Sequence, residues 1–309
     1  MLSPNGQPSA HRDPSFGAPL KSRLLSIALC SLVSAVATAQ RGTLFIVGGG
    51  PQPPALVQQF VDLAGGRGKA HIVVFGMASE DGEKAGEEKA DDLRKLGAEA
   101  KNVWVNHAQA NTDSVAHLLD HATGVWFVGG DQVKLIAALR GTKTETAMHA
   151  RYEHAGAVIA GTSAGAAVMS AIMITGDERH PGGARPDTST GGFMTIARND
   201  IAVDSAFGFL RNAIIDQHFL RRKRHNRLIS VALELAPHLA AGIDESTALI
   251  VRPDGTWRVA GESAVTIYDA RHAAITPARA STLGATDIRM HVLPAGAEFD
   301  PNTGRAKLP

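Results

Sequence analysis

From residue 43 onward, short apolar runs alternate with stretches of helical periodicity. The apolar runs are rich in β-branched residues and hydrophobic at consecutive positions, as in strands that are buried on both faces of a parallel sheet. This alternation predicts an α/β fold in which a mostly parallel sheet is flanked by helices. Strands are predicted over residues 43–47, 71–75, 103–106, 125–128 and 157–160, and helices over 54–64, 83–96, 114–122, 132–139 and 145–154.

The second half of the chain has a different pattern. Residues 176–192 are dense in Gly, Pro, Asp, Ser and Thr, which is typical of a long surface loop. A strand over 213–216 and a helix over 224–235 are predicted after it. Shorter β-like pieces follow, which predict a short β-rich C-terminal extension that adds to the sheet or caps one of its edges.

The first forty residues have the order of a secretory signal. Lys21 and Arg23 precede an apolar run over 24–36, and the small-residue triplet 37–39 follows it. The run is too short to cross a bilayer as a mature helix. We therefore predict a signal peptide over 1–39, a single catalytic domain over 40–309, a secreted or periplasmic protein, and no membrane association after cleavage.

Charge and composition exclude several classes of partner. The formal net charge of +1 gives no indication of nucleic-acid binding. The single cysteine, Cys30, lies inside the predicted signal, so no disulfide is expected in the mature chain. His117 and His121 stand four apart without a third ligand, and the glycines at 48–50 lack the spacing of a dinucleotide fingerprint. We expect neither a metal nor a cofactor, and interpret residues 48–50 as a turn.

Residues 156–168 carry the strongest chemical motif. A predicted buried strand runs into Gly161-Thr162-Ser163-Ala164-Gly165 and then into a small-residue helix. In such a strand-to-helix turn the serine is exposed as a nucleophile, and the helix N-terminus offers amide donors to an oxyanion. The alternative is a glycine-rich turn in which Ser163 caps the helix.

A serine nucleophile needs a base, and His218 is the candidate among thirteen histidines. It follows an apolar strand, residues 213–216, and the carboxyl ends of parallel strands gather at one edge of a sheet. His218 can therefore lie beside Ser163. A structural histidine is the alternative at such a position.

Four motifs, in order along the chain, resemble those of the cyanophycinases, serine peptidases of family S51, a group that also includes aspartyl dipeptidase. They are FVGGDQ at 127–132, GTSAGAAVM at 161–169, IIDQHF with RxRxxRL at 214–228, and GIDESTALIV at 242–251. The resemblance covers most of residues 43–252. It implies a class I glutamine amidotransferase-like fold and a homodimer.

The resemblance also implies catalytic roles. Ser163 would be the nucleophile, His218 the general base and Glu178 the orienting acid, with Asp177 as the fallback. The backbone amides of Gly130 and Asp131 would form an oxyanion hole with the amide of Ala164, which would stabilise the tetrahedral intermediate.

The residues around His218 favour recognition of a carboxylate. Arg222, Arg224 and Arg227 follow it closely, and guanidinium groups match carboxylates bidentately. A solvated helix face is the alternative for these arginines taken alone. By resemblance, Gln132, Asp216 and Gln217 also line the substrate pocket, where Asp216 either accepts from a substrate guanidinium or holds the local turn. Asp244 and Glu245 are interpreted as architectural, with a role in the pocket as the alternative.

The resulting hypothesis is an exported serine peptidase that hydrolyses cyanophycin, a polyaspartate whose side chains carry arginine, to β-Asp-Arg dipeptides. The partner would be that polymer or β-Asp-Arg-containing peptides. An aspartyl dipeptidase of the same family is the first alternative. An esterase of the α/β-hydrolase type and an inactive periplasmic binding protein are further alternatives.

Overall fold

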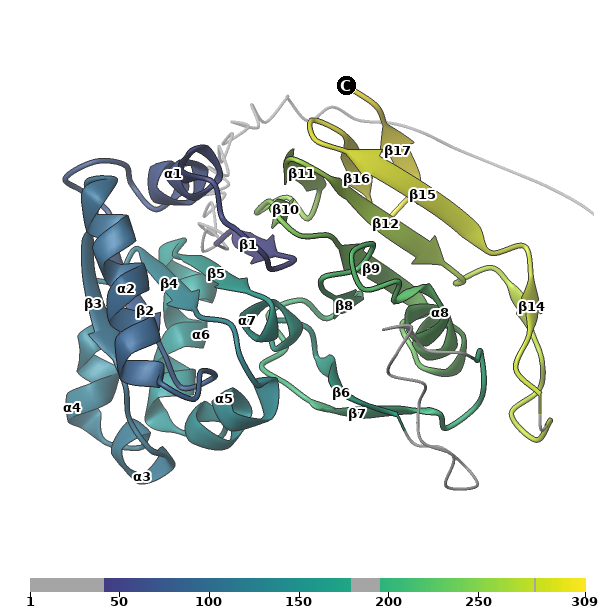
Figure 1. The fold of residues 1–309 in the computed structure, drawn as a ribbon, viewed down its shortest axis with the longest axis horizontal. Helices are drawn as coiled ribbons and strands as arrows, with labels where there is room; N and C mark the ends of the chain where they lie inside the picture. Colours follow the sequence, from purple (N-terminus) through teal and green to yellow (C-terminus); the bar gives the residue numbers. More distant parts are fainter. Residues whose placement is uncertain (1–41, 179–194, 281) are drawn as a thin grey trace, which may run out of the picture. The chain divides into compact units, whose positions relative to one another are not determined.

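Five parallel strands form one side of the first, nine-stranded sheet in the computed structural model (Figure 1). The model describes residues 42–178, 195–280 and 282–309, so the predicted signal peptide and most of the predicted loop over 176–192 lie outside the described residues. The five strands pair in the order β1-β5-β4-β2-β3. They are β1 (Leu44–Val47), β2 (His71–Phe75), β3 (Glu99–Val103), β4 (Gly124–Phe127) and β5 (Val158–Thr162).

Helices connect these strands, as the alternation predicts. Pro54 starts α1, a position where proline costs no hydrogen bond, and Gly156 ends α6 in the left-handed conformation with φ of 71°. The helices are α1 (Pro54–Leu63), α2 (Gly82–Lys95), α3 (His107–Ala110), α4 (Asp113–Ala116), α5 (Gln132–Leu139), α6 (Lys143–Ala155), α7 (Ala164–Ala167) and, later in the chain, α8 (His225–Glu234). A 3-10 turn, His117–Leu119, follows α4.

Antiparallel strands from the C-terminal half extend the first sheet beyond β1. β10 pairs with β1 in antiparallel register, with Leu44 opposite Val251, and the order continues β10-β11-β16-β17. These strands are β10 (Thr247–Val251), β11 (Trp257–Gly261), β16 (Glu298–Asp300) and β17 (Arg305–Lys307).

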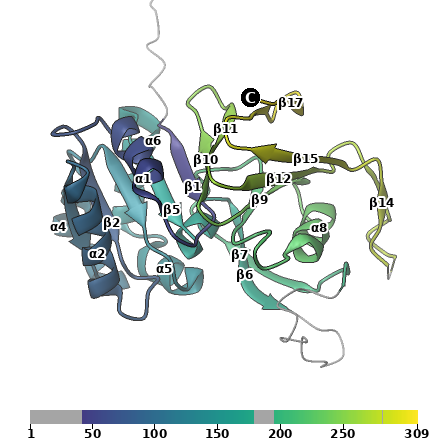
Figure 2. The same cartoon turned by 45° about the horizontal axis from the view of Figure 1, so that its top comes forward.

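A second sheet packs against the first and has the order β15-β12-β9-β8-β6-β7 (Figure 2). Within it β6, β8 and β9 run parallel, and the others are antiparallel to their neighbours. Its strands are β6 (Ile172–Glu178), β7 (Ile201–Ser205), β8 (Ile214–Asp216), β9 (Leu239–Ile243), β12 (Ala264–Asp269) and β15 (Arg289–Pro294). β13 (Ala274–Ile275) and β14 (Ala285–Thr286) form a separate hairpin.

Three cores hold these layers together. Residues on one face of the first sheet pack against α1 and α2, around Phe60 and Trp126. Residues on its other face, including Phe127 and Ile159, pack against α5, α6 and the second sheet. The far face of the second sheet packs against α8, around Phe219 and Leu228.

The predicted fold class is confirmed: helices flank a mixed sheet that contains five adjacent parallel strands, and the C-terminal region is rich in strands. One strand was misplaced, because β3 spans Glu99–Val103 instead of 103–106. β3 is the edge strand, and its residues alternate between exposed and covered, so it lacks the continuous apolar run of a buried strand. In the described part of the chain, no helix is long and apolar enough to cross a membrane.

The α1 interface gives a test of the packing. Phe60 is fully buried and its ring lies 5.0 Å from that of Trp126, whereas Leu63 on the same helix is 45% exposed. We expect Phe60→Ala to lower the free energy of unfolding by about 3–5 kcal/mol, because the substitution leaves a cavity. Leu63→Ala, the control, should change it by less than about 0.5 kcal/mol. Urea denaturation measures both, and equal effects of the two substitutions would contradict this packing.

Candidate active site

Ser163 occupies a strained corner between β5 and α7. Its backbone has φ of 55° and ψ of −113°, a conformation that residues other than glycine rarely adopt. The two flanking glycines make the corner possible: a Cβ at Gly161 would lie 2.5 Å from the Gly165 carbonyl oxygen, and one at Gly165 would lie 2.4 Å from that of Phe127. The strand-to-helix turn expected from the sequence is therefore present.

His218 reaches Ser163 from the other sheet. It follows β8, is buried, and also has a positive φ of 47°. Its backbone amide donates to the carbonyl of Gly48 at 2.6 Å, and its Nε2 lies 2.8 Å from Ser163 Oγ. The structure thus brings together the two residues that sequence analysis assigned as nucleophile and base.

Glu245 lies on the opposite side of the imidazole. Its Oε1 is 2.6 Å from His218 Nδ1. A carboxylate only accepts hydrogen bonds, so Nδ1 carries a proton and Nε2 is left to accept from the Ser163 hydroxyl. This arrangement is that of a hydroxyl, an imidazole base and an orienting carboxylate.

Glu245, which was interpreted from the sequence as architectural, makes the contact with His218 that was expected of Glu178. Glu178 ends β6, opposite Ile201 of β7, and its side chain and that of Asp177 lie outside the described residues. The neighbouring Asp244 is architectural: it accepts from the Arg221 amide at 3.0 Å and from the Ser263 hydroxyl at 2.7 Å.

The glycine run at 48–50 forms a close-fitting wall behind His218 and Glu245. A Cβ at Gly49 would lie 2.3 Å from His218 Cε1, and one at Gly50 would lie 2.7 Å from Glu245 Cβ. From the sequence, this run was interpreted only as a turn. Its position directly after the first predicted strand could have indicated its role, because a glycine run there allows the backbone to approach the side chains of the site closely.

The surroundings lower the pKa of His218. Burial is the largest cause, and the positive charges of Arg222 and Arg224 act in the same direction, against the hydrogen bond that His218 donates to Glu245. The imidazole is therefore neutral at pH 7, which is the form that can accept a proton from Ser163.

The loop over 129–131 lies against the nucleophile, but only part of it suits an oxyanion hole. A Cβ at Gly129 would lie 3.3 Å from Ser163 Cβ. Within the described residues, the amides of Gly130 and Ala164 have no hydrogen-bond acceptor. The assignment of Asp131 is corrected: its amide donates to the Ala78 carbonyl at 2.8 Å, and its carboxylate caps α5 by accepting from the Val133 amide at 2.7 Å.

The predicted pocket residues Asp216 and Arg227 form a buried ion pair. Arg227 Nε donates to Asp216 Oδ2 at 2.7 Å, and a second bond joins its Nη2 to Oδ1. Both side chains are at most 2% exposed. Arg227 is therefore engaged inside the fold, and its guanidinium is not presented to a substrate.

The other predicted pocket residues differ in their exposure and in their hydrogen-bond partners. Arg224 donates to the backbone and side-chain oxygens of Gln217 at 2.8 and 2.7 Å, and burial lowers the pKa of Arg224 to about 10, which leaves it charged at pH 7. Arg222 is exposed, and its charge acts on His218. Gln132 is buried, and its amide nitrogen donates to the carbonyls of Ile174 and Thr175, so it braces β6.

The family of this chain follows from its similarity to known protein families. The model of peptidase family S51 matches residues 44–258, which include all the residues of the site. The chain belongs to peptidase family S51. As a member of this family it is a hydrolase that acts on peptide bonds.

Family members of known function are similar over most of the chain. The cyanophycinase of Trichormus variabilis is 30% identical over 242 residues, which are 76% of this chain and 76% of that one. The cyanophycinase of Synechococcus elongatus is 29% identical over 277 residues, or 86% and 81% of the two chains. A solved peptidase from an acI-B1 Actinobacterium has the same fold, with a TM-score of 0.60 and 21% identity over 85% of this chain and 98% of that one.

The identity of the orienting acid can be tested with two substitutions. Glu245→Gln should lower kcat by about 10³-fold or more, because the amide does not hold the required imidazole tautomer or stabilise the imidazolium. Glu178→Gln should leave kcat within about two-fold, because Glu245 already occupies Nδ1. Steady-state kinetics of both variants measure this, and the reverse ranking would return the role to Glu178.

The effect of the arginines on His218 can be tested by pH. The pKa of His218 is lowered from 6.5, so its neutral form persists below that value and the acid limb of kcat/KM should lie below pH 6.5. Arg222→Ala removes one positive charge, raises this pKa and should move the acid limb to higher pH. A neutral p-nitrophenyl ester as substrate keeps carboxylate binding out of the measurement. Arg258 is an exposed arginine elsewhere, so the control Arg258→Ala should leave the acid limb unchanged. An unshifted acid limb in Arg222→Ala would contradict the electrostatic coupling.

Proposed function

We propose that this chain is an exported serine-type peptidase that hydrolyses cyanophycin to β-Asp-Arg dipeptides. The observation that carries the proposal is the hydrogen-bonded series from Ser163 through His218 to Glu245, at 2.8 and 2.6 Å. The similarity to two cyanophycinases over more than three quarters of the chain supports the choice of substrate.

In the proposed mechanism His218 removes the proton of the Ser163 hydroxyl as Oγ attacks the scissile carbonyl carbon. The amides of Gly130 and Ala164 would hold the oxyanion of the tetrahedral intermediate. The imidazolium, stabilised by Glu245, then gives its proton to the leaving amine, which produces an acyl-enzyme. Water, activated by the same imidazole, hydrolyses the ester and restores the serine. The mechanism requires neither metal nor cofactor.

The charges beside His218 support an acidic, arginine-bearing substrate. Each arginine of cyanophycin presents a free α-carboxylate. Arg222, which is exposed, and Arg224, which is still charged, are suited to bind such a group, whereas Arg227 is neutralised by Asp216. Carboxylate recognition is therefore assigned to two of the three predicted arginines.

Export and assembly are parts of the same proposal. The signal-like order over residues 21–39 would direct the chain out of the cytoplasm. Outside the cell membrane, its substrate would be a polymer too large to import. A homodimer is expected from the resemblance to cyanophycinases.

Purified protein lacking residues 1–39 tests the substrate and the nucleophile together. Digestion of cyanophycin should release β-Asp-Arg, identified by mass, and Ser163→Ala should lower the rate by about 10⁴-fold or more, because the triad then has no nucleophile. A panel of α- and β-aspartyl dipeptides and a p-nitrophenyl ester serves as the comparison. Cleavage of aspartyl dipeptides with an intact polymer would favour the dipeptidase, and ester turnover alone would favour the esterase.

A further inference from the structure

Trp104 is an aromatic side chain that the fold leaves open to solvent. It directly follows β3 and is 57% exposed, whereas Trp126 and Trp257 are fully buried. An indole gains about 2 kcal/mol or more from burial, so one held open at the surface marks a candidate contact site.

The ring is held in place from below. A Cβ at Gly82, the first residue of α2, would lie 2.8 Å from both Cδ1 and Nε1 of Trp104. The indole edge therefore rests on a position that has no side chain. This contact restricts the ring while its exposed face stays accessible, which lowers the entropy cost of binding a ligand there.

Trp104 lines a groove of about 510 Å³, a volume sufficient for an arginine-sized group. Met77 and Ala138 contribute apolar surface to this groove, and Gln109 and Lys134 contribute polar groups. Lys134 is exposed on α5. The groove thus offers an aromatic face and a solvent-exposed cation.

The groove and Ser163 both lie where the parallel strands of the first sheet end, because Trp104 directly follows β3 and Ser163 directly follows β5. Met77 precedes Ala78, whose carbonyl accepts from the Asp131 amide, and a Cβ at Gly130 would lie 2.1 Å from that carbonyl oxygen. The wall of the groove therefore touches the proposed oxyanion loop. α3 and α5, which contribute Gln109 and Lys134, pack against each other below this edge (Figure 1).

The strand order sets the distance to the catalytic serine. β3 is the third strand from β5, and strands in a sheet lie about 4.8 Å apart, which places Trp104 about 14 Å from Ser163 along the edge. An extended chain advances about 3.5 Å per residue, so this distance corresponds to about four residues of a polymer.

We propose that this groove is a second subsite for the polymer, in which Trp104 stacks on the guanidinium of an arginine-bearing residue and Lys134 pairs with the α-carboxylate of the same arginine. Guanidinium groups stack on indole faces, and each arginine of the polymer carries both a guanidinium and a free carboxylate. The subsite would hold a residue about four positions from the bond being cleaved. This inference rests on the proposed function.

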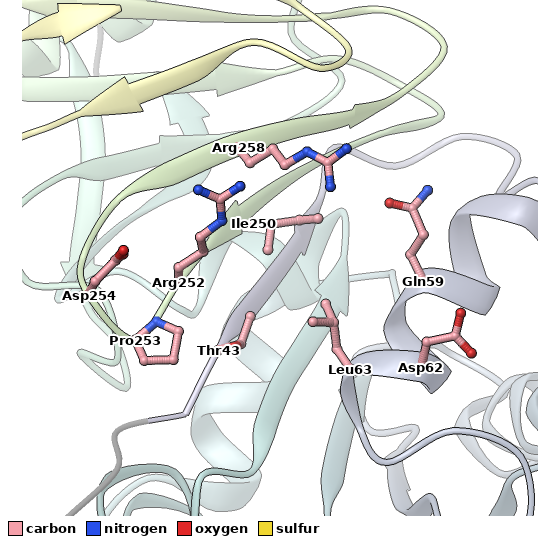
Figure 3. Close-up of a pocket in the computed structure, with 9 residues that line it drawn as sticks. All are labelled: Thr43, Gln59, Asp62, Leu63, Ile250, Arg252, Pro253, Asp254 and Arg258. Atoms are coloured by element: carbon pink, nitrogen blue, oxygen red, sulfur yellow. The ribbon is translucent and has the colours of Figure 1, made fainter. Parts of the chain in front are cut away.

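Another groove, of about 610 Å³, is less suited to this role (Figure 3). It lies by Thr43, which precedes β1, and so at the opposite edge of the sheet from Ser163. Its Arg252 is already paired with Glu298 at 2.7 Å. A chain bound there would have to pass around the sheet to reach the nucleophile.

Kinetics with two substrate lengths test the subsite. For soluble cyanophycin, Trp104→Ala and Lys134→Gln should each raise KM about five-fold with kcat unchanged. For a substrate of only two β-Asp-Arg units, which has no residue four positions from the bond being cleaved, both should leave kcat/KM within about two-fold of the starting enzyme. Met290→Ala, a residue of β15 with the same 57% exposure, and Lys101→Gln, an exposed lysine of β3, serve as matched controls that should behave as the starting enzyme on both substrates.

The outcomes separate the two proposals. If the starting enzyme cleaves neither substrate, the proposed function is contradicted. If it cleaves both and Trp104→Ala raises KM on neither or equally on both, the subsite is contradicted. Binding is measured separately in Ser163→Ala, where addition of cyanophycin should change the tryptophan fluorescence and the change should be lost in the double variant with Trp104→Phe. Conversion of a dimer to a monomer by Trp104→Ala, seen by light scattering, would make Trp104 an interface between copies and overturn the inference.

Discussion

Two adjacent carbonyl groups at the end of β1 hold the proposed nucleophile and its proposed base. The Val47 carbonyl accepts from the Ser163 amide at 3.1 Å, and the Gly48 carbonyl accepts from the His218 amide at 2.6 Å. Ser163 belongs to the first sheet and His218 to the second, so the geometry between their side chains depends on these two bonds from one short segment. The Ser246 amide donates to the Gly49 carbonyl at 2.9 Å, which ties the residue after Glu245 to the same segment. The glycines can make these approaches because any Cβ at 48, 49 or 50 would overlap a neighbouring group.

Backbone strain is concentrated at the same place. Ser163, His218 and Ser246 have φ of 55°, 47° and 53°, and such conformations cost about 1–3 kcal/mol each. The cores on both faces of the first sheet offset this cost. A nucleophile, a base and an acid held in this way need little reorganisation when the reaction begins, and catalysis by charge stabilisation depends on that preorganisation.

Features formed by consecutive residues could be predicted from the sequence, whereas contacts that depend on the pairing of distant strands could not. The turn at Ser163 could be recognised because strand, glycines and helix are consecutive, and His218 because it directly follows an apolar strand. Glu245 could not be chosen, because its contact arises from the pairing of β8 with β9 in a second sheet that the sequence did not predict. Burial was equally hidden, because Arg222, Arg224 and Arg227 look alike along the chain. Arg227 is buried in its pair with Asp216, Arg224 is largely buried 3.8 Å from the same carboxylate, and Arg222 is exposed. The edge strand β3 was misplaced because its exposed side chains lack an apolar run.

The distribution of charge around His218 links substrate recognition to the base. Asp216 neutralises Arg227, and Arg224 lies only 3.8 Å from the same carboxylate, so these two guanidiniums share one buried negative charge. Burial, and after it the positive charges of Arg222 and Arg224, lower the pKa of His218, which keeps the imidazole neutral but also makes it a weaker base. A substrate carboxylate that pairs with Arg222 would remove part of this repulsion and raise the pKa again. His218 would then be a stronger base once the proposed substrate is bound, so the same arginines that select an acidic ligand would also increase the reactivity of Ser163 toward it.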